Sequence, residues 1–166
     1  MVEIEKEFKE KGKEAENKFK EWLDKHNITY LYISQNQENY SQAFRKTFSG
    51  KRPDFIVLIP NFGCIFVDVK SRKLSSEFKT FPIDIDDVEK YSSVHSIFNL
   101  PIWFVISNEE CGYMTWYWLS IAKILSKNIS QKISSKSKEG FFPIPIKYFK
   151  QIADNESINK LFSAKF

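Results

Sequence analysis

Residues 50–73 read GKRPDFIVLIPNFGCIFVDVKSRK, and this stretch decides the fold. It holds two short runs of β-branched and aromatic residues, at 54–59 and 64–70, which the turn-forming sequence Pro-Asn-Phe-Gly at 60–63 separates. Runs this short that are bounded by Pro and Gly favour strands over helix. We therefore predict a β-hairpin whose two strands are neighbours in one sheet.

The second strand of this hairpin carries two charged residues on one face. Side chains alternate along a strand, so Asp68 and Lys70 point to the same side as Phe66. A carboxylate in an otherwise apolar strand is costly unless it is paired, hydrogen-bonded or bound to a metal. Lys70 can form a buried ion pair with Asp68, but Asp54 at the start of the adjacent strand brings a second carboxylate alongside. Two carboxylates and one lysine leave room for a cation.

A helix before the hairpin supplies a third carboxylate. Apolar residues recur at spacings of three and four within 3–26, among them Ala15, Phe19 and Leu23, while the other faces are almost entirely Lys and Glu. At about 100° per residue, Glu16 lies about 20° beyond Leu23, on the margin of the buried face. We predict that Glu16 looks toward the sheet.

The remaining pattern is typical of an α/β fold. Strand-like runs occupy 28–33, 102–106 and 114–119, and an amphipathic helix is predicted at 85–99. The central strands are apolar on both faces, so helices must cover both sides of the sheet. We therefore predict a central mixed β-sheet of four to five strands that is flanked by helices.

The domain organisation is expected to be simple. No internal repeat or change of composition divides the chain, so residues 1–166 are predicted to form a single domain with a core at about 3–120. A Lys- and Ser-rich segment and helices are expected over 121–166. The charged N-terminus and the lack of a long apolar run predict a cytoplasmic protein without a membrane span.

The amino-acid composition limits the kinds of metal site and catalytic site that the chain can form. With only two cysteines and two histidines, the chain lacks the ligands for a disulfide framework, a structural zinc site or a multi-histidine metal site. A net charge of +4 permits a polyanionic partner. Carboxylate oxygens suit Mg²⁺ or Mn²⁺, which favour phosphate substrates, so the chemistry that fits is phosphodiester hydrolysis.

The hairpin sequence resembles the PD-(D/E)XK nuclease motif, with Pro53-Asp54 as its first half and Asp68-Val69-Lys70 as its second. Asp68 stands where glutamate is commoner in that superfamily. The pattern KGKEAENKF, in which Glu16 follows a glycine by four residues, is similar to the first helix of archaeal-type Holliday junction resolvases. The resemblance covers roughly residues 10–106.

This resemblance implies a restriction-endonuclease-like core and a metal-dependent endonuclease that acts on DNA. It implies that Glu16, Asp54, Asp68 and the Val69 carbonyl hold Mg²⁺, for which Mn²⁺ can substitute, and that Lys70 assists the attacking water. No nucleotide cofactor is expected. The nucleases of this pattern serve junction resolution, repair, recombination, defence or mobile elements, and a homodimer suits resolvases because a four-way junction needs two symmetric cuts.

Basic residues flank both halves of the motif. Their ordinary role is a solvated surface, but their position also suits contacts with DNA phosphates. The residues with this predicted role are Arg45, Lys46, Lys51, Arg52, Arg72, Lys73 and Lys90.

A different class of function stays open: a non-catalytic nucleic-acid-binding or protein-interaction domain that keeps the nuclease fold. Its working surface would be the lysine-rich segment at 123–138. A complete set of three acids and a lysine favours the enzyme, because a pure binder gains nothing from convergent carboxylates.

Overall fold

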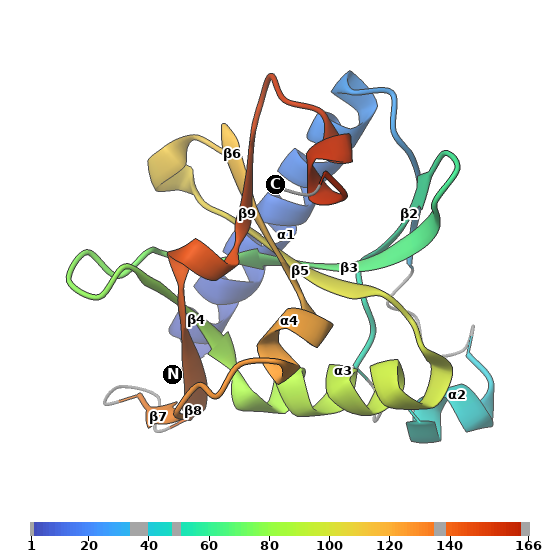
Figure 1. Ribbon diagram of the computed structural model, residues 1–166. Coiled ribbons are helices and arrows are strands. Elements are labelled where there is room, and N and C mark those ends of the chain that lie inside the picture. Colours follow the sequence, from blue (N-terminus) through green and yellow to red (C-terminus); the bar gives the residue numbers. More distant parts are fainter. Residues whose placement is uncertain (1, 34–39, 48–50, 135–138, 164–166) are drawn as a thin grey trace.

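A six-stranded mixed sheet forms the centre of the protein (Figure 1), in a computed structural model that describes residues 2–33, 40–47, 51–134 and 139–163. The helices are α1 (Val2–Lys25), α2 (Gln42–Thr47), α3 (Ile85–Phe98) and α4 (Ile121–Leu125), and short 3₁₀ turns occupy Glu109–Cys111, Ile146–Tyr148 and Ile158–Leu161. The strands are β1 (Thr29–Tyr32), β2 (Phe55–Ile59), β3 (Gly63–Ser71), β4 (Thr80–Asp84), β5 (Ile102–Ser107), β6 (Thr115–Ser120), β7 (Lys132–Ile133), β8 (Gly140–Pro145) and β9 (Lys150–Ala153).

The predicted hairpin is the pair β2 and β3, which run antiparallel with Phe55 opposite Val67. Asn61 and Gly63 in the turn between them have φ of 62° and 119°, values that Asn and Gly adopt more readily than other residues. β3 then pairs in parallel with β5, which the chain reaches by crossing over through β4 and α3. The expected mixed α/β sheet is therefore confirmed.

The sheet has six strands in the order β1-β2-β3-β5-β6-β9, instead of the four to five expected. The additional strand is β9, which pairs antiparallel with β6 at the edge of the sheet. It is four residues long, and Ile152 is the member that is fully buried. So short a run with one core residue has no clear alternating pattern, which explains why the sequence did not predict it.

Helices cover both faces of this sheet, as expected. α1 packs on one face, where Ala15, Phe19 and Leu23 are buried in a cluster with Val67 and Trp116. α3 and α4 cover the other face (Figure 1), where side chains such as those of Val88, Ile102 and Ile124 form a second cluster. β3 lies between the two clusters and sends Asp68 and Lys70 to the α3 side.

The expectation of helices over 121–166 was largely wrong. In the described part of this region α4 is the only α-helix, and β8 joins β4 and β7 in a separate three-stranded sheet. Pro143 and Pro145 lie in β8 and cannot donate backbone hydrogen bonds, so a helix there is excluded. Residues 135–138 of the lysine-rich segment lie outside the described residues. No described helix is both long and apolar enough to cross a membrane.

Candidate active site

Asp54 ties the two strands of the hairpin together immediately before β2 begins. Its backbone N–H donates to the Val67 carbonyl at 2.8 Å, and its Oδ2 accepts a hydrogen bond from the Val69 N–H at 2.7 Å. The residue is only 8% exposed. Asp54 is therefore fixed beside the second half of the motif, as the hairpin requires.

The Asp68 side chain points from β3 toward α3, and the residue is 3% exposed. Its Oδ1 accepts a hydrogen bond from the buried Tyr91 hydroxyl of α3 at 3.0 Å. Its Oδ2 lies 2.8 Å from Lys70 Nζ, in an ion pair. Among the described residues, no other donor of a hydrogen bond to this oxygen is found.

Lys70 lies between two carboxylates. Its Nζ is 2.8 Å from Asp68 Oδ2 and 2.6 Å from Asp87 Oδ2, and its side chain is 14% exposed. Asp87 comes from the first turn of α3, and its other oxygen lies 2.7 Å from Lys51 Nζ. Negative and positive groups therefore alternate from Asp68 through Lys70 and Asp87 to Lys51.

Glu16 approaches the same region from α1. It is half-buried, and its carboxylate accepts a hydrogen bond of 2.6 Å from the Tyr32 hydroxyl of β1. Its negative charge is one of the causes that raise the pKa of Asp54. Glu16 is thus an electrostatic neighbour of Asp54, although Tyr32 holds the end of its side chain.

Placing these carboxylates close together inside the protein costs electrostatic free energy. Burial, together with the negative charges of Asp68 and Glu16, raises the pKa of Asp54 to about 8. For Lys70, burial alone would lower the pKa, but Asp68 and Asp87 together raise it well above its ordinary value. The surroundings thus disfavour the charged form of Asp54 and favour the charged form of Lys70.

The carboxylate oxygens of these residues are suitable ligands for a hard divalent cation, but in the described part of the chain three ligating side chains do not surround one position. Among the described residues, no three Asp, Glu, His or Cys side chains lie close enough together to enclose a metal ion. Mg²⁺ keeps several waters and often takes only one or two carboxylates from a protein. Asp54 and Asp68 are two buried oxygen donors whose mutual repulsion a cation would relieve. Glu16 is bound to Tyr32 through one carboxylate oxygen, Oε2.

Most of the basic residues predicted to contact DNA already have acidic or aromatic neighbours. Arg72 pairs with Asp84, Lys73 with Glu110 and Lys90 with Asp86, at 2.6 to 2.8 Å, while Lys51 pairs with Asp87. The Arg52 guanidinium lies 4.7 Å from the Tyr40 ring centre, and Arg45 donates to the Tyr40 carbonyl. Through Asp87, Lys51 is joined by an ion pair to the network around Lys70.

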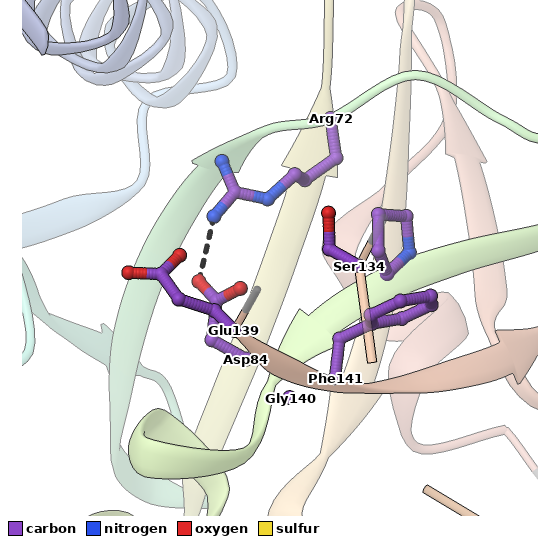
Figure 2. A pocket seen from close by; sticks show the side chains of 7 residues that line it. Arg72, Asp84, Ser134, Glu139, Gly140 and Phe141 are labelled. Carbon is purple, nitrogen blue, oxygen red and sulfur yellow. Dashed lines mark hydrogen bonds and ion pairs between the residues drawn. The ribbon is translucent and has the colours of Figure 1, made fainter. Parts of the chain in front are cut away.

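A cavity of about 270 Å³ lies away from the motif, against the small sheet of β4, β7 and β8. Figure 2 shows Arg72 and Asp84 joined in an ion pair at this cavity, which is lined by Arg72, Pro82, Asp84, Ser134, Glu139, Gly140 and Phe141. None of the three motif side chains lines it. Because its lining includes none of these side chains, this cavity does not compete with the hairpin as the candidate site.

Sequence reasoning missed two residues of the network, Asp87 and Tyr91. Tyr91 lies within the predicted helix at 85–99, and Asp87 precedes it by four residues, so both fall on one face of α3. An acid one turn before a buried tyrosine was the available signal. It was overlooked because acids in the first turn of a helix are common for an unrelated reason, the helix dipole.

The Tyr91 hydroxyl should contribute measurably to stability. We expect Tyr91→Phe to lower the free energy of unfolding by about 1–3 kcal/mol, because the buried Asp68 Oδ1 loses its donor. Urea denaturation measures the change. Tyr117→Phe is the matched control, since no hydrogen bond of the Tyr117 hydroxyl is found in the described part of the chain. Equal losses in both variants would contradict a specific role for the Tyr91 hydroxyl.

The comparisons with known proteins gave structural likeness without sequence relatives. No family model matches the chain, and no curated protein matches its sequence. The solved structure of Hjc, a Holliday junction resolvase from the archaeal hyperthermophile Archaeoglobus fulgidus, matches with a TM-score of 0.50 and 14% identity, over 82% of this chain and 91% of that one. D212, a nuclease from a fusselovirus, matches with a TM-score of 0.46 and 13% identity, over 86% and 80%. The likeness to the resolvase establishes a shared fold.

Proposed function

Because the chain has the restriction-endonuclease-like, or PD-(D/E)XK, fold, we propose that it is a metal-dependent endonuclease that hydrolyses DNA phosphodiester bonds. Asp54, Asp68, the Val69 carbonyl and Glu16 would hold Mg²⁺, with Mn²⁺ as a substitute, and Lys70 would assist the attacking water. The observation that carries the proposal is the meeting of two buried aspartates and one partly buried lysine at the end of the β2–β3 hairpin.

Mg²⁺, held by the residues named above, would supply a water of lowered pKa and positive charge beside the phosphate. The side chains do the rest. Lys70 is held as a cation between Asp68 and Asp87, so it orients the water and stabilises negative charge on the phosphate oxygens, and does not act as a base. Asp54 is fixed by the Val69 N–H, which aims one carboxylate oxygen along the backbone of β3.

The proposed substrate class is supported by the charge of the chain and by the fold that it shares with a resolvase. We propose that residues 1–166 form one nuclease domain that selects DNA by its shape, as the resolvase function of the structural neighbour suggests. The net charge of +4 and the basic residues around the motif are compatible with phosphate contacts. A two-fold homodimer would let two such sites cut a junction symmetrically.

A cleavage assay tests the activity directly. Labelled four-way junction, flap, linear duplex and single-stranded DNA are incubated with the protein in Mg²⁺ or Mn²⁺, with EDTA as the control. We expect metal-dependent cutting that is strongest on one branched substrate and leaves 5′-phosphate and 3′-hydroxyl ends. DNA binding without any cutting would reject the nuclease and favour the non-catalytic binding domain.

Metal binding should also be visible without DNA. We expect Mn²⁺ or Mg²⁺ to raise the melting temperature by several degrees, because a ligand at about 100 times its Kd stabilises the folded state by about 2.7 kcal/mol. Asp68→Ala should abolish this shift. Asp154→Ala, which removes the partner of Lys25 at the far end of α1, should retain it. A metal shift that survives in Asp68→Ala would place the ion elsewhere.

A further inference from the structure

We propose that Asp87 is a positioning residue, which holds the Lys70 ammonium in place for catalysis and is itself held by Lys51. This inference rests on the proposed nuclease function and extends it to a residue outside the PD-(D/E)XK motif. Asp87 would act through Lys70 and would touch neither the metal nor the DNA.

The contacts of Asp87 are specific and buried. Its two carboxylate oxygens have different partners: Oδ2 lies 2.6 Å from Lys70 Nζ, and Oδ1 lies 2.7 Å from Lys51 Nζ. The Asp87 side chain is 7% exposed, and that of Lys51 is 28% exposed. One carboxylate thus connects β3, the segment before β2, and the first turn of α3.

A second ion-pair partner is needed to hold the Lys70 ammonium group in place. The Lys70 side chain is long, and its first partner, Asp68, is also a proposed metal ligand. Four rotatable bonds separate Nζ from the backbone, and one ion pair leaves much of that freedom in place. Asp68 is also a proposed metal ligand, and a cation on its carboxylate weakens its attraction for the ammonium. Asp87 offers Lys70 an acceptor that metal binding leaves unchanged.

Lys51 explains how Asp87 stays charged in this buried position. Burial would raise the pKa of Asp87, but the positive charges of Lys70 and Lys51 lower it below its ordinary value. The network contains two lysines, Lys51 and Lys70, and two aspartates, Asp68 and Asp87. The positive charge of Lys51 therefore compensates the negative charge that Asp87 adds near Asp68. The arrangement of two lysines about one carboxylate is a geometric fact that is independent of this titration.

A purely structural role for Asp87 explains less. An acid in the first turn stabilises a helix by its interaction with the dipole, and the exposed Asp86 is already placed for that. That role needs neither burial nor contact with two lysines from other elements. Burying Asp87 costs desolvation energy, which the contact with Lys70 and Lys51 offsets.

The test uses Asp87→Asn, which keeps the shape of the side chain and removes its charge, with Glu89→Gln as the matched control. Glu89 lies on the exposed face of the same helix and carries the same charge. We expect Asp87→Asn to lower the single-turnover cleavage rate at saturating DNA by about 10- to 100-fold, as misplacement of a catalytic group does. The half-saturating DNA concentration and the metal-induced rise in melting temperature should stay unchanged. Glu89→Gln should cut at the wild-type rate.

A direct measurement of the ammonium group separates this proposal from the proposed function. The side-chain ¹⁵N resonance of the Lys70 NH₃⁺ group, assigned by its disappearance in Lys70→Met, should shift or broaden in Asp87→Asn and remain in place in Glu89→Gln. This NMR measurement does not depend on DNA cleavage. It therefore decides whether Asp87 holds Lys70 even if the wild-type protein cuts none of the DNA substrates.

Each other outcome has a definite meaning. Wild-type cleavage with an undiminished rate in Asp87→Asn overturns the positioning role and leaves the nuclease in place. Loss of both the rate and the metal-induced stabilisation shows that Asp87 supports the whole site, which also overturns the proposal. Absence of wild-type cleavage rejects the proposed function, and an unchanged Lys70 resonance then rejects the positioning of Lys70 as well.

Discussion

Replacing Lys70 by methionine should reduce DNA cleavage by at least about a hundredfold at saturating substrate. Methionine has nearly the same length but carries no charge, so the variant loses the cation beside Asp68 while the β3 backbone is retained. Loss of one electrostatic group of this kind typically costs about 10²–10³ in rate. Single-turnover cleavage of the preferred DNA substrate measures the effect.

Two controls make this result interpretable. Lys70→Met leaves Asp68 and Asp87 buried without their shared partner, which can cost about 3–5 kcal/mol of stability, so circular dichroism must show that the variant is folded at the assay temperature. Lys25→Met removes an ion-paired lysine from the C-terminal end of α1 and should cut normally. A folded Lys70→Met that cuts within threefold of the wild-type rate would exclude Lys70 from the chemistry.

Asp54→Asn should change stability and activity in opposite directions. The variant should lose cleavage and the metal-induced rise in melting temperature, yet in EDTA the protein should become more stable, by up to about 5 kcal/mol at pH 8. Asparagine can still accept the hydrogen bond from the Val69 N–H through its Oδ1. It carries no charge that burial, Asp68 or Glu16 could oppose.

The sign of the pH dependence follows from the raised pKa of Asp54. Its value of about 8 in the folded protein lies above the ordinary value of 3.8, so the folded state binds this proton more tightly than the unfolded state does. The stability from this proton is complete at low pH and is lost as the pH rises from about 4 to 8. The advantage of Asp54→Asn should therefore be small at pH 5 and larger at pH 8, in thermal melts with EDTA. A variant less stable than the wild type at both pH values would contradict this account.

The hairpin could be predicted to within one residue at each strand end, because Pro60 and Gly63 punctuate it and its apolar runs are short. The alternation on β3 likewise placed Asp68 and Lys70 on one face, where the structure has them. These are local patterns, and a single sequence contains them in full. The proposed roles of these residues await the experiments above.

The features that escaped prediction depend on contacts between distant parts of the chain. β4 and β8 pair Phe81 with Ile144, far apart in sequence; β8 has no alternating burial pattern, and the alternation of β4 extends over five residues only. Asp87 acquires its partners only when α3 docks against β3 and the segment before β2. The sequence around Asp87 looks like the ordinary start of a helix, so its contact with Lys70 could be recognised only in three dimensions.

The short turn between β2 and β3 also affects the order in which the chain folds. Closing so small a loop costs little chain entropy, so we expect Asp54 and Asp68 to approach each other early, while water still surrounds both carboxylates. Their repulsion grows when α1 and α3 dock on opposite sides of the sheet and exclude that water. We therefore expect divalent cations, which relieve the repulsion between the two aspartates, to accelerate the docking of the helices and to leave hairpin formation unaffected.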